Sequence, residues 1–140
     1  LKMIGVAKMM TNGKTKTNEI TLQQLFNHQK ENQNAMLKNG VYNEYRQRST
    51  HSVPVDDVGL ASYHIQHLIS EVGEVLEADK RWKSHRNDQC DKPKKLDELA
   101  DCFIVLMNVA MFSGFDENDL VDAIEKKLDI VSERLGDLMV

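Results

Sequence analysis

The sequence predicts an all-α protein that folds as an antiparallel four-helix bundle. Leu, Met, Glu, Lys and Gln are frequent, while the 140 residues include only two prolines and 6% aromatic residues, a composition that favours helices over strands. Four stretches also carry apolar residues at the helical spacings of three and four. The connections between these stretches are short, and short connections make consecutive helices antiparallel neighbours.

The first helix is expected over residues 21–39. Thr21 followed by Gln24 is a capping-box pattern, and Gly40 is a typical helix end. The apolar face of this helix also contains Gln29 and Gln33. These amides are interpreted either as a partly solvated flank or as contacts to a base or sugar.

The segments on either side of this helix are expected to be irregular. Residues 1–19 show no sustained periodicity, so we expect a flexible leader before a single domain over residues 20–140. Residues 40–55 contain Pro54 and lack an apolar period, which predicts a loop. The tyrosines and arginines of this loop are ordinary loop residues or contacts to a base and a phosphate; they are Tyr42, Tyr45, Arg46 and Arg48.

The second helix is expected over residues 57–84, capped by Asp56 or Asp57. Glu71 and Glu74 lie at the edge of its apolar stripe, which consists of Ile65, Leu68, Ile69, Val72, Val75 and Leu76. His64 and His67 lie beside Glu71. Trp82 falls near the same side, where it either packs at the helix end or contacts a ligand.

The third helix is expected over residues 93–113, with Pro93 in its first turn. Apolar residues cover most of its circumference, so it should be the central and most buried helix. Its single polar stripe consists of Asp97, Glu98, Asp101 and Asn108. Because polar groups on a buried helix need partners, this stripe indicates function.

The fourth helix is expected over residues 117–138, after Gly114 and a cap at Asp116. Lys127 and Arg134 lie along one edge of its long apolar seam, where they are either solvated or placed to bind a triphosphate. The apolar surface of the third and fourth helices exceeds what a small bundle buries. We therefore expect a homodimer or a larger assembly.

Two acidic pairs, Glu71 with Glu74 and Glu98 with Asp101, are separated by 23 residues. Residues three apart are neighbours on one helical face. Two such pairs facing each other in a semi-buried place are unfavourable unless a cation compensates their charge. The four residues are therefore predicted to bind Mg²⁺ in the service of phosphate chemistry.

Composition argues against several other classes. The net charge of −4 is unlike the basic face that nucleic-acid binding requires. No apolar run approaches the ~18–20 residues of a membrane span, and the start of the chain is not a convincing signal peptide. Cys90 and Cys102 lack metal-site or redox spacing and are expected to be free thiols in a reducing cytoplasm.

The stretches HLISEVGEVLEADKRW and LDELADCFIVLMNVAMFSGFDENDLVDAIEKKLDIVSERL resemble the all-alpha nucleoside triphosphate pyrophosphatases, the MazG-like enzymes and the related dimeric dUTPases. The resemblance covers roughly residues 60–135 and rests on both acidic pairs in their helical contexts. The segment LQQLFNHQKEN is similar, more loosely, to the first helix of the dimeric dUTPases. A position where the family often has Asn is Val131 here.

The resemblance implies a MazG-like bundle assembled as a homodimer or tetramer. It implies Mg²⁺, with Mn²⁺ as a substitute, held by Glu71, Glu74, Glu98 and Asp101. The substrate would be a (deoxy)nucleoside triphosphate cleaved to the monophosphate and pyrophosphate, with house-cleaning of the nucleotide pool as the role. The implied substrate contacts are Lys127, Arg134 and Gln29; Asn108 and Trp82 join them as candidates from the pattern described above.

Two other classes of protein are alternatives to this interpretation. A di-iron carboxylate bundle requires Glu-x-x-His pairs, and no His in the sequence has an acid three residues before it, although His64 and His67 could still join a metal site. A non-catalytic helical dimeric binding or regulatory module would also explain the helices. That class predicts that changing an acid to its amide is neutral or stabilising.

Overall fold

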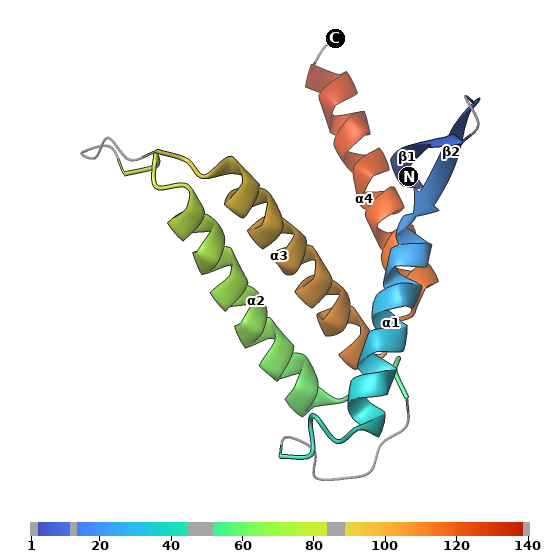
Figure 1. Ribbon diagram of the computed structural model, residues 1–140, viewed down its shortest axis with the longest axis vertical. Helices are drawn as coiled ribbons and strands as arrows, with labels where there is room; N and C mark the ends of the chain where they lie inside the picture. The colour runs from blue at the N-terminus through green and yellow to red at the C-terminus, as the bar shows by residue number, and fades with distance from the viewer. Residues whose placement is uncertain (1–2, 12–13, 45–51, 84–88, 139–140) are drawn as a thin grey trace.

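The computed structural model describes residues 3–11, 14–44, 52–83 and 89–138. The backbone forms a β-hairpin followed by four helices (Figure 1). The elements are β1 (Met3–Thr11), β2 (Lys14–Thr21), α1 (Leu22–Lys38), α2 (Val58–Ala78), α3 (Lys92–Phe112) and α4 (Glu117–Leu138). The four predicted helices are therefore confirmed.

The hairpin occupies the segment for which the sequence predicted no regular structure. Strands β1 and β2 pair antiparallel, with Thr11 opposite Lys14 and Met3 opposite Thr21. The sequence signal for such a hairpin is the dipeptide Asn12-Gly13, which lies outside the described residues. Strand β2 ends at Thr21, which is also the N-cap of α1, so the chain passes from strand to helix without a linker.

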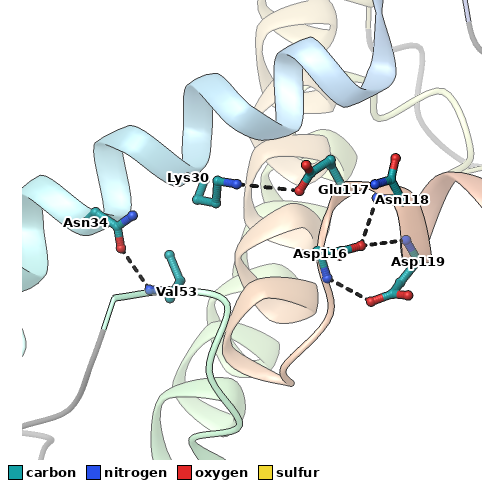
Figure 2. Close-up of polar contacts among 7 residues, drawn as sticks. All are labelled: Lys30, Asn34, Val53, Asp116, Glu117, Asn118 and Asp119. Carbon is teal, nitrogen blue, oxygen red and sulfur yellow. Dashed lines mark hydrogen bonds and ion pairs between the residues drawn. The ribbon is translucent and has the colours of Figure 1, made fainter.

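Side-chain caps begin the helices where the sequence predicted them. The Thr21 hydroxyl accepts from the backbone N–H of Gln24, whose side chain accepts in return from the backbone N–H of Thr21. Asp57 caps α2. At α4 the Asp116 carboxylate accepts from two backbone N–H groups, one of them on Asp119, whose carboxylate accepts from the Asp116 backbone (Figure 2).

Helix α2 ends at Ala78, six residues before its predicted end. The backbone of Asp79 is extended, and the Asp79 carboxylate accepts hydrogen bonds from Arg81 and from Lys95 of α3. These contacts turn the chain towards α3 and end the helix. Trp82 consequently lies beyond α2 and is exposed.

Helices α2 and α3 pack against each other antiparallel along their lengths and form the most extensive helix pair (Figure 1). Helix α1 contacts α3 and α4 over shorter stretches. Helix α4 runs away from the α2–α3 pair, and its N-terminal turn is tied to α1 by an ion pair from Lys30 Nζ to Glu117 Oε2 at 3.5 Å (Figures 1 and 2). Asn34 of α1 also accepts from the Val53 backbone N–H, which holds the segment before α2 against α1 (Figure 2).

The hydrophobic core lies where α1, the start of α2 and the end of α3 meet. Its buried members are Phe26, Tyr42, Val53, Leu60, Ala61, Met107, Met111 and Phe112. Helix α3 was predicted to be the central and most buried helix, and its buried residues all lie in its C-terminal half: Val105, Met107, Asn108, Met111 and Phe112. Leu96, Leu99 and Phe103 of α3 are exposed. Helix α4 diverges from the α2–α3 pair (Figure 1).

A large apolar surface is left uncovered on three helices. It comprises Ile65, Ile69, Val72 and Leu76 on α2, Leu96, Leu99, Phe103 and Leu106 on α3, and Leu128, Val131, Leu135 and Leu138 on α4. We call this set the exposed apolar face. Cys90 and Cys102 are free, as the sequence predicted. Within the described ranges, none of the helices combines the length and apolarity needed to cross a membrane.

Candidate metal centre

Three carboxylates from two helices converge between α2 and α3. Glu71 and Glu74 lie three residues apart on α2, and Glu98 lies on α3. One carboxylate oxygen from each residue lies within 4.8 Å of the others. The spacing of three puts both α2 carboxylates on the side that packs against α3, so the antiparallel helix pair creates the cluster. We call these three residues the glutamate cluster.

The environment of the glutamate cluster disfavours full ionisation. Burial raises the pKa of Glu71, and the neighbouring Glu74 and Asp101 raise it further, while a hydrogen bond from His67 opposes the rise. The pKa of Glu98 is also raised, chiefly by its close contact with the Glu74 carboxyl and then by burial. The cluster is thus a place where negative charge is concentrated at a cost in free energy.

Two buried oxygens in this cluster lack partners. Oε2 of Glu71 and Oε2 of Glu98 are inaccessible to solvent and accept no hydrogen bond from the described residues. A buried carboxylate oxygen without a partner costs about 1–3 kcal/mol or more. A hard divalent cation takes carboxylate oxygens as ligands and would satisfy both atoms together. The three carboxylates therefore form a donor set that suits a hard divalent cation.

Asp101, the fourth predicted ligand, lies next to the cluster without being part of the compact group of three. It is one helical turn beyond Glu98 on α3 and is exposed. Asp101 lines the same cavity as Glu71, and its charge raises the pKa values of Glu71 and Glu98. The structure thus brings three of the four predicted ligands together and leaves the fourth at their edge.

A cavity of about 400 Å³ adjoins the acids and is lined by residues of α1, α2, α3 and the segment after α1. Glu71 and Asp101 belong to its wall, together with aromatic and amide side chains. The other lining residues are Gln29, Gln33, Met36, Val41, Tyr42, Tyr63, His64, His67, Ile104, Val105 and Asn108. A space of this size with a few polar groups among apolar ones is typical of a small-molecule site.

Two predicted substrate contacts meet in the cavity wall. Nε2 of Gln29 on α1 donates to Oδ1 of Asn108 on α3 at 2.9 Å. Asn108 is only 4% exposed, so its place in the polar stripe of α3 is explained by this partner. Nearby, the Tyr42 hydroxyl donates to Oε1 of Gln33 at 2.6 Å, and the pKa of Tyr42 is raised mainly by burial.

The two histidines beside Glu71 have different surroundings. His67 Nε2 lies 2.9 Å from Glu71 Oε1. His64 is 2% exposed and stacks on Phe112, with ring centroids 5.0 Å apart. Burial and the nearby His67 lower the pKa of His64 to about 4, so its imidazole is neutral at physiological pH.

Tyr63 and the burial of Tyr42 in the cavity wall were missed from the sequence. Tyr63 falls within the α2 pattern with no feature that distinguishes it. Tyr42 was noted as a loop residue, but its burial depends on a contact with Gln33 that spacing does not reveal. The other loop residues for which binding was considered, Tyr45, Arg46 and Arg48, lie outside the described residues.

The remaining predicted contacts are not gathered at this site. Lys127 and Arg134 are exposed on α4, and neither lines the cavity nor is hydrogen-bonded to the acids within the described residues. Trp82 lines a separate surface pocket with Asp79 and Arg81. Lys127 and Arg134 lie away from the acids because α4 diverges from the α2–α3 pair (Figure 1). Trp82 lies away from them because α2 ends at Ala78, before this residue.

Comparison of the chain with protein-family models, with curated proteins and with solved structures gave no match.

Proposed function

We propose that the protein is a Mg²⁺-dependent nucleoside triphosphate pyrophosphohydrolase that cleaves a (deoxy)nucleoside triphosphate to the monophosphate and pyrophosphate. The glutamate cluster carries this proposal, because its converging oxygens include two buried atoms that a cation would satisfy. The resemblance to the MazG-like enzymes over residues 60–135, which rests on the same acidic pairs in their helical contexts, also supports it.

Glu71, Glu74 and Glu98 would hold the metal, and Asp101 lies at the edge of this group. When bound, Mg²⁺ supplies Lewis acidity and charge neutralisation towards the phosphates. A carboxylate that does not contact the metal directly would take a proton from the attacking water. Asp101 suits this role because it is exposed and adjoins both the cluster and the cavity.

The cavity beside the acids would receive the nucleoside part of the substrate. Its volume of about 400 Å³ lies within the range of small-molecule sites. Gln29 and Asn108 present amide groups in its wall, and amides can pair with the polar edge of a base. In this proposal the phosphates would lie at the acids and the base would lie towards α1.

The proposal includes self-association as a homodimer or tetramer of the MazG-like type. The exposed apolar face consists of large side chains on α2, α3 and α4 that are each at least 40% exposed, and their burial against a second chain would be favourable. A second chain that covers this face would complete a closed four-helix bundle. In such an assembly Lys127 and Arg134 on α4 could contact the phosphate oxygens, which is the role that the resemblance implies for them.

A non-catalytic helical dimeric module is the second candidate, and the exposed apolar face favours it equally. The two candidates differ in what they require of the glutamate cluster. The enzyme needs the acids for turnover, whereas the module keeps them without a chemical role. House-cleaning of non-standard or surplus nucleotides is the role that the enzyme would have.

The test is pyrophosphate release from a panel of canonical and modified (deoxy)nucleoside triphosphates with Mg²⁺, with orthophosphate assayed in parallel. We expect pyrophosphate from a few substrates, and its loss on chelation. Glu98→Gln should lower turnover more than about 100-fold, since several kcal/mol of charge stabilisation are lost. Asp97→Asn is the matched control, because Asp97 precedes Glu98 on α3 but is exposed outside the cluster. Absence of pyrophosphate from every substrate, with folded protein, would favour the module.

A further inference from the structure

His67 and Glu71 are four residues apart on α2, so they lie one above the other on the same helical face. The distance between His67 Nε2 and Glu71 Oε1 is 2.9 Å. When Glu71 is ionised, as a metal ligand is, its carboxylate can only accept, so the proton of this hydrogen bond is on Nε2. The nitrogen that faces the acids is therefore committed to Glu71 and is not available as a metal ligand.

The same hydrogen bond divides the two oxygens of Glu71 into different roles. Oε1 accepts from His67, while Oε2 is buried and has no partner among the described residues. The Glu71 side chain is only 13% exposed, so water cannot easily replace His67 at Oε1 or reach Oε2. A cation at the glutamate cluster would therefore meet one oxygen of Glu71 that is free and one that is already hydrogen-bonded.

We propose that His67 is a positioning residue that restricts Glu71 to monodentate metal binding and thereby favours Mg²⁺ over Ca²⁺. This inference rests on the proposed function, because it assumes that the cluster binds a divalent cation. Mg²⁺ takes six ligands in a compact octahedron and is satisfied by single carboxylate oxygens and water. Ca²⁺ takes six to eight ligands at longer distances and gains from bidentate carboxylates.

The selectivity follows from the difference between these two ligand sets. With Oε1 held by His67, Glu71 offers the short single contact that Mg²⁺ prefers. Without the imidazole, Oε1 is free to turn towards the cation, and the bidentate arrangement that Ca²⁺ prefers becomes accessible. Hydrogen-bond partners of metal ligands typically change metal affinity 10–100-fold when they are removed.

The experiment measures the dissociation constants of Mg²⁺ alone and Ca²⁺ alone by titration calorimetry, without nucleotide. Three variants distinguish positioning from packing: His67→Leu removes the donor, His67→Gln places an amide N–H near the position of Nε2, and His67→Asn places one near Nδ1. His28→Leu is the control, because His28 is an exposed histidine of α1 outside the cavity wall.

For His67→Leu we expect the ratio of Mg²⁺ to Ca²⁺ affinity to fall about tenfold or more. His67→Gln should retain the wild-type ratio, and His67→Asn should behave like the leucine variant. An unchanged ratio in His67→Leu, or equal behaviour of the glutamine and asparagine variants, would overturn the inference. If His67→Leu does not fold, the inference is tested by comparing the affinity ratios of His67→Gln and His67→Asn alone.

The outcome also separates this inference from the proposed function. If the wild-type protein binds neither cation, both the metal centre and the role of His67 are wrong. If the wild-type protein binds Mg²⁺ and releases pyrophosphate but the ratio does not respond to His67, only the positioning role is wrong.

Discussion

Gln29 on α1 and Asn108 on α3 are joined by a side-chain hydrogen bond of 2.9 Å across 79 residues of sequence. The bond lies in the wall of the cavity beside the acids, where Asn108 is almost fully buried. It therefore has two consequences: it ties α1 to the centre of the fold, and it fixes the direction in which the Asn108 amide is presented.

Replacement of Asn108 by Ala should destabilise the fold by about 1–3 kcal/mol, because the Gln29 amide loses its buried partner. Chemical denaturation measures this change. In the double variant Gln29→Ala, Asn108→Ala, the loss should be smaller than the sum of the two single losses, by about 0.5 kcal/mol or more. Additive losses would mean that the hydrogen bond contributes nothing specific to stability.

The melting temperature of the Glu98→Gln variant, compared with that of the wild type, should depend on whether Mg²⁺ is present. In chelator we expect its melting temperature to equal or exceed that of the wild type, since the change removes repulsion from the glutamate cluster. Added Mg²⁺ should raise the wild-type melting temperature and raise that of the variant much less, because ligands stabilise the state that binds them. Thermal scans with and without Mg²⁺ test both statements. A wild-type melting temperature that does not respond to Mg²⁺ would contradict the metal centre.

Features that depend on residues close in the sequence were predictable, whereas features that depend on residues far apart in the sequence were not. The bounds of α1, α3 and α4 were predictable to within one residue because caps and periodicity are local, as Thr21 with Gln24 shows. The convergence of Glu71, Glu74 and Glu98 was also predictable, since helical spacing and an antiparallel pair determine it. The end of α2 was not, because Asp79 makes its contacts with Lys95, 16 residues away.

The positions of Lys127 and Arg134 show the limit of this reasoning. Their spacing correctly predicts that both lie on one edge of α4, but it contains no information on the direction of α4 relative to α2 and α3. That direction depends on contacts such as Lys30 with Glu117, which involve residues far apart in the chain. The hairpin differs, because its local signal is the dipeptide Asn12-Gly13, whereas residues 1–19 as a whole show no sustained periodicity.

The buried His64 should make the fold sensitive to mild acid. Its pKa of about 4 in the folded chain lies below the value of 6.5 expected in the unfolded chain. Between these values the unfolded chain binds more protons, so stability falls as the pH decreases from about 6.5 to 4, by roughly 3 kcal/mol in total. Urea denaturation across this pH range measures the effect.

The matched variant is His64→Phe, which keeps an aromatic ring against Phe112 but cannot be protonated. The difference in unfolding free energy between wild type and variant should change with pH only between about 4 and 6.5. Carboxylates that titrate in the same range affect both proteins alike and cancel in the difference. A difference that is constant with pH would show that His64 is protonated without cost in the folded state.

Asp79 should contribute stability that depends on both pH and salt. Hydrogen bonds from Arg81 and then from Lys95 hold the pKa of Asp79 well below its ordinary value. A carboxylate with a depressed pKa stabilises the fold at neutral pH, and this contribution is lost as the pH falls below about 4. Asp79→Asn should therefore lower the melting temperature at pH 7, less so in high salt, and the gap should narrow in acid. Asp122→Asn, an exposed acid on α4, should change little under the same conditions.

The exposed apolar face leads to the last prediction, which concerns self-association. Val131 and Leu135 on α4 are 49% and 53% exposed, in line with leucines above and below them. Burial of such a stripe against a second chain gains about 25 cal/mol per Å² of apolar surface, and a buried glutamate would oppose it. The wild-type chain should sediment as a dimer or tetramer, and Val131→Glu with Leu135→Glu should shift it to monomer. Lys126→Glu, on the opposite side of α4 by helical spacing, should leave the assembly intact. A wild-type protein that is monomeric at micromolar concentration would contradict the assembly, and would leave Lys127 and Arg134 without a route to the acids.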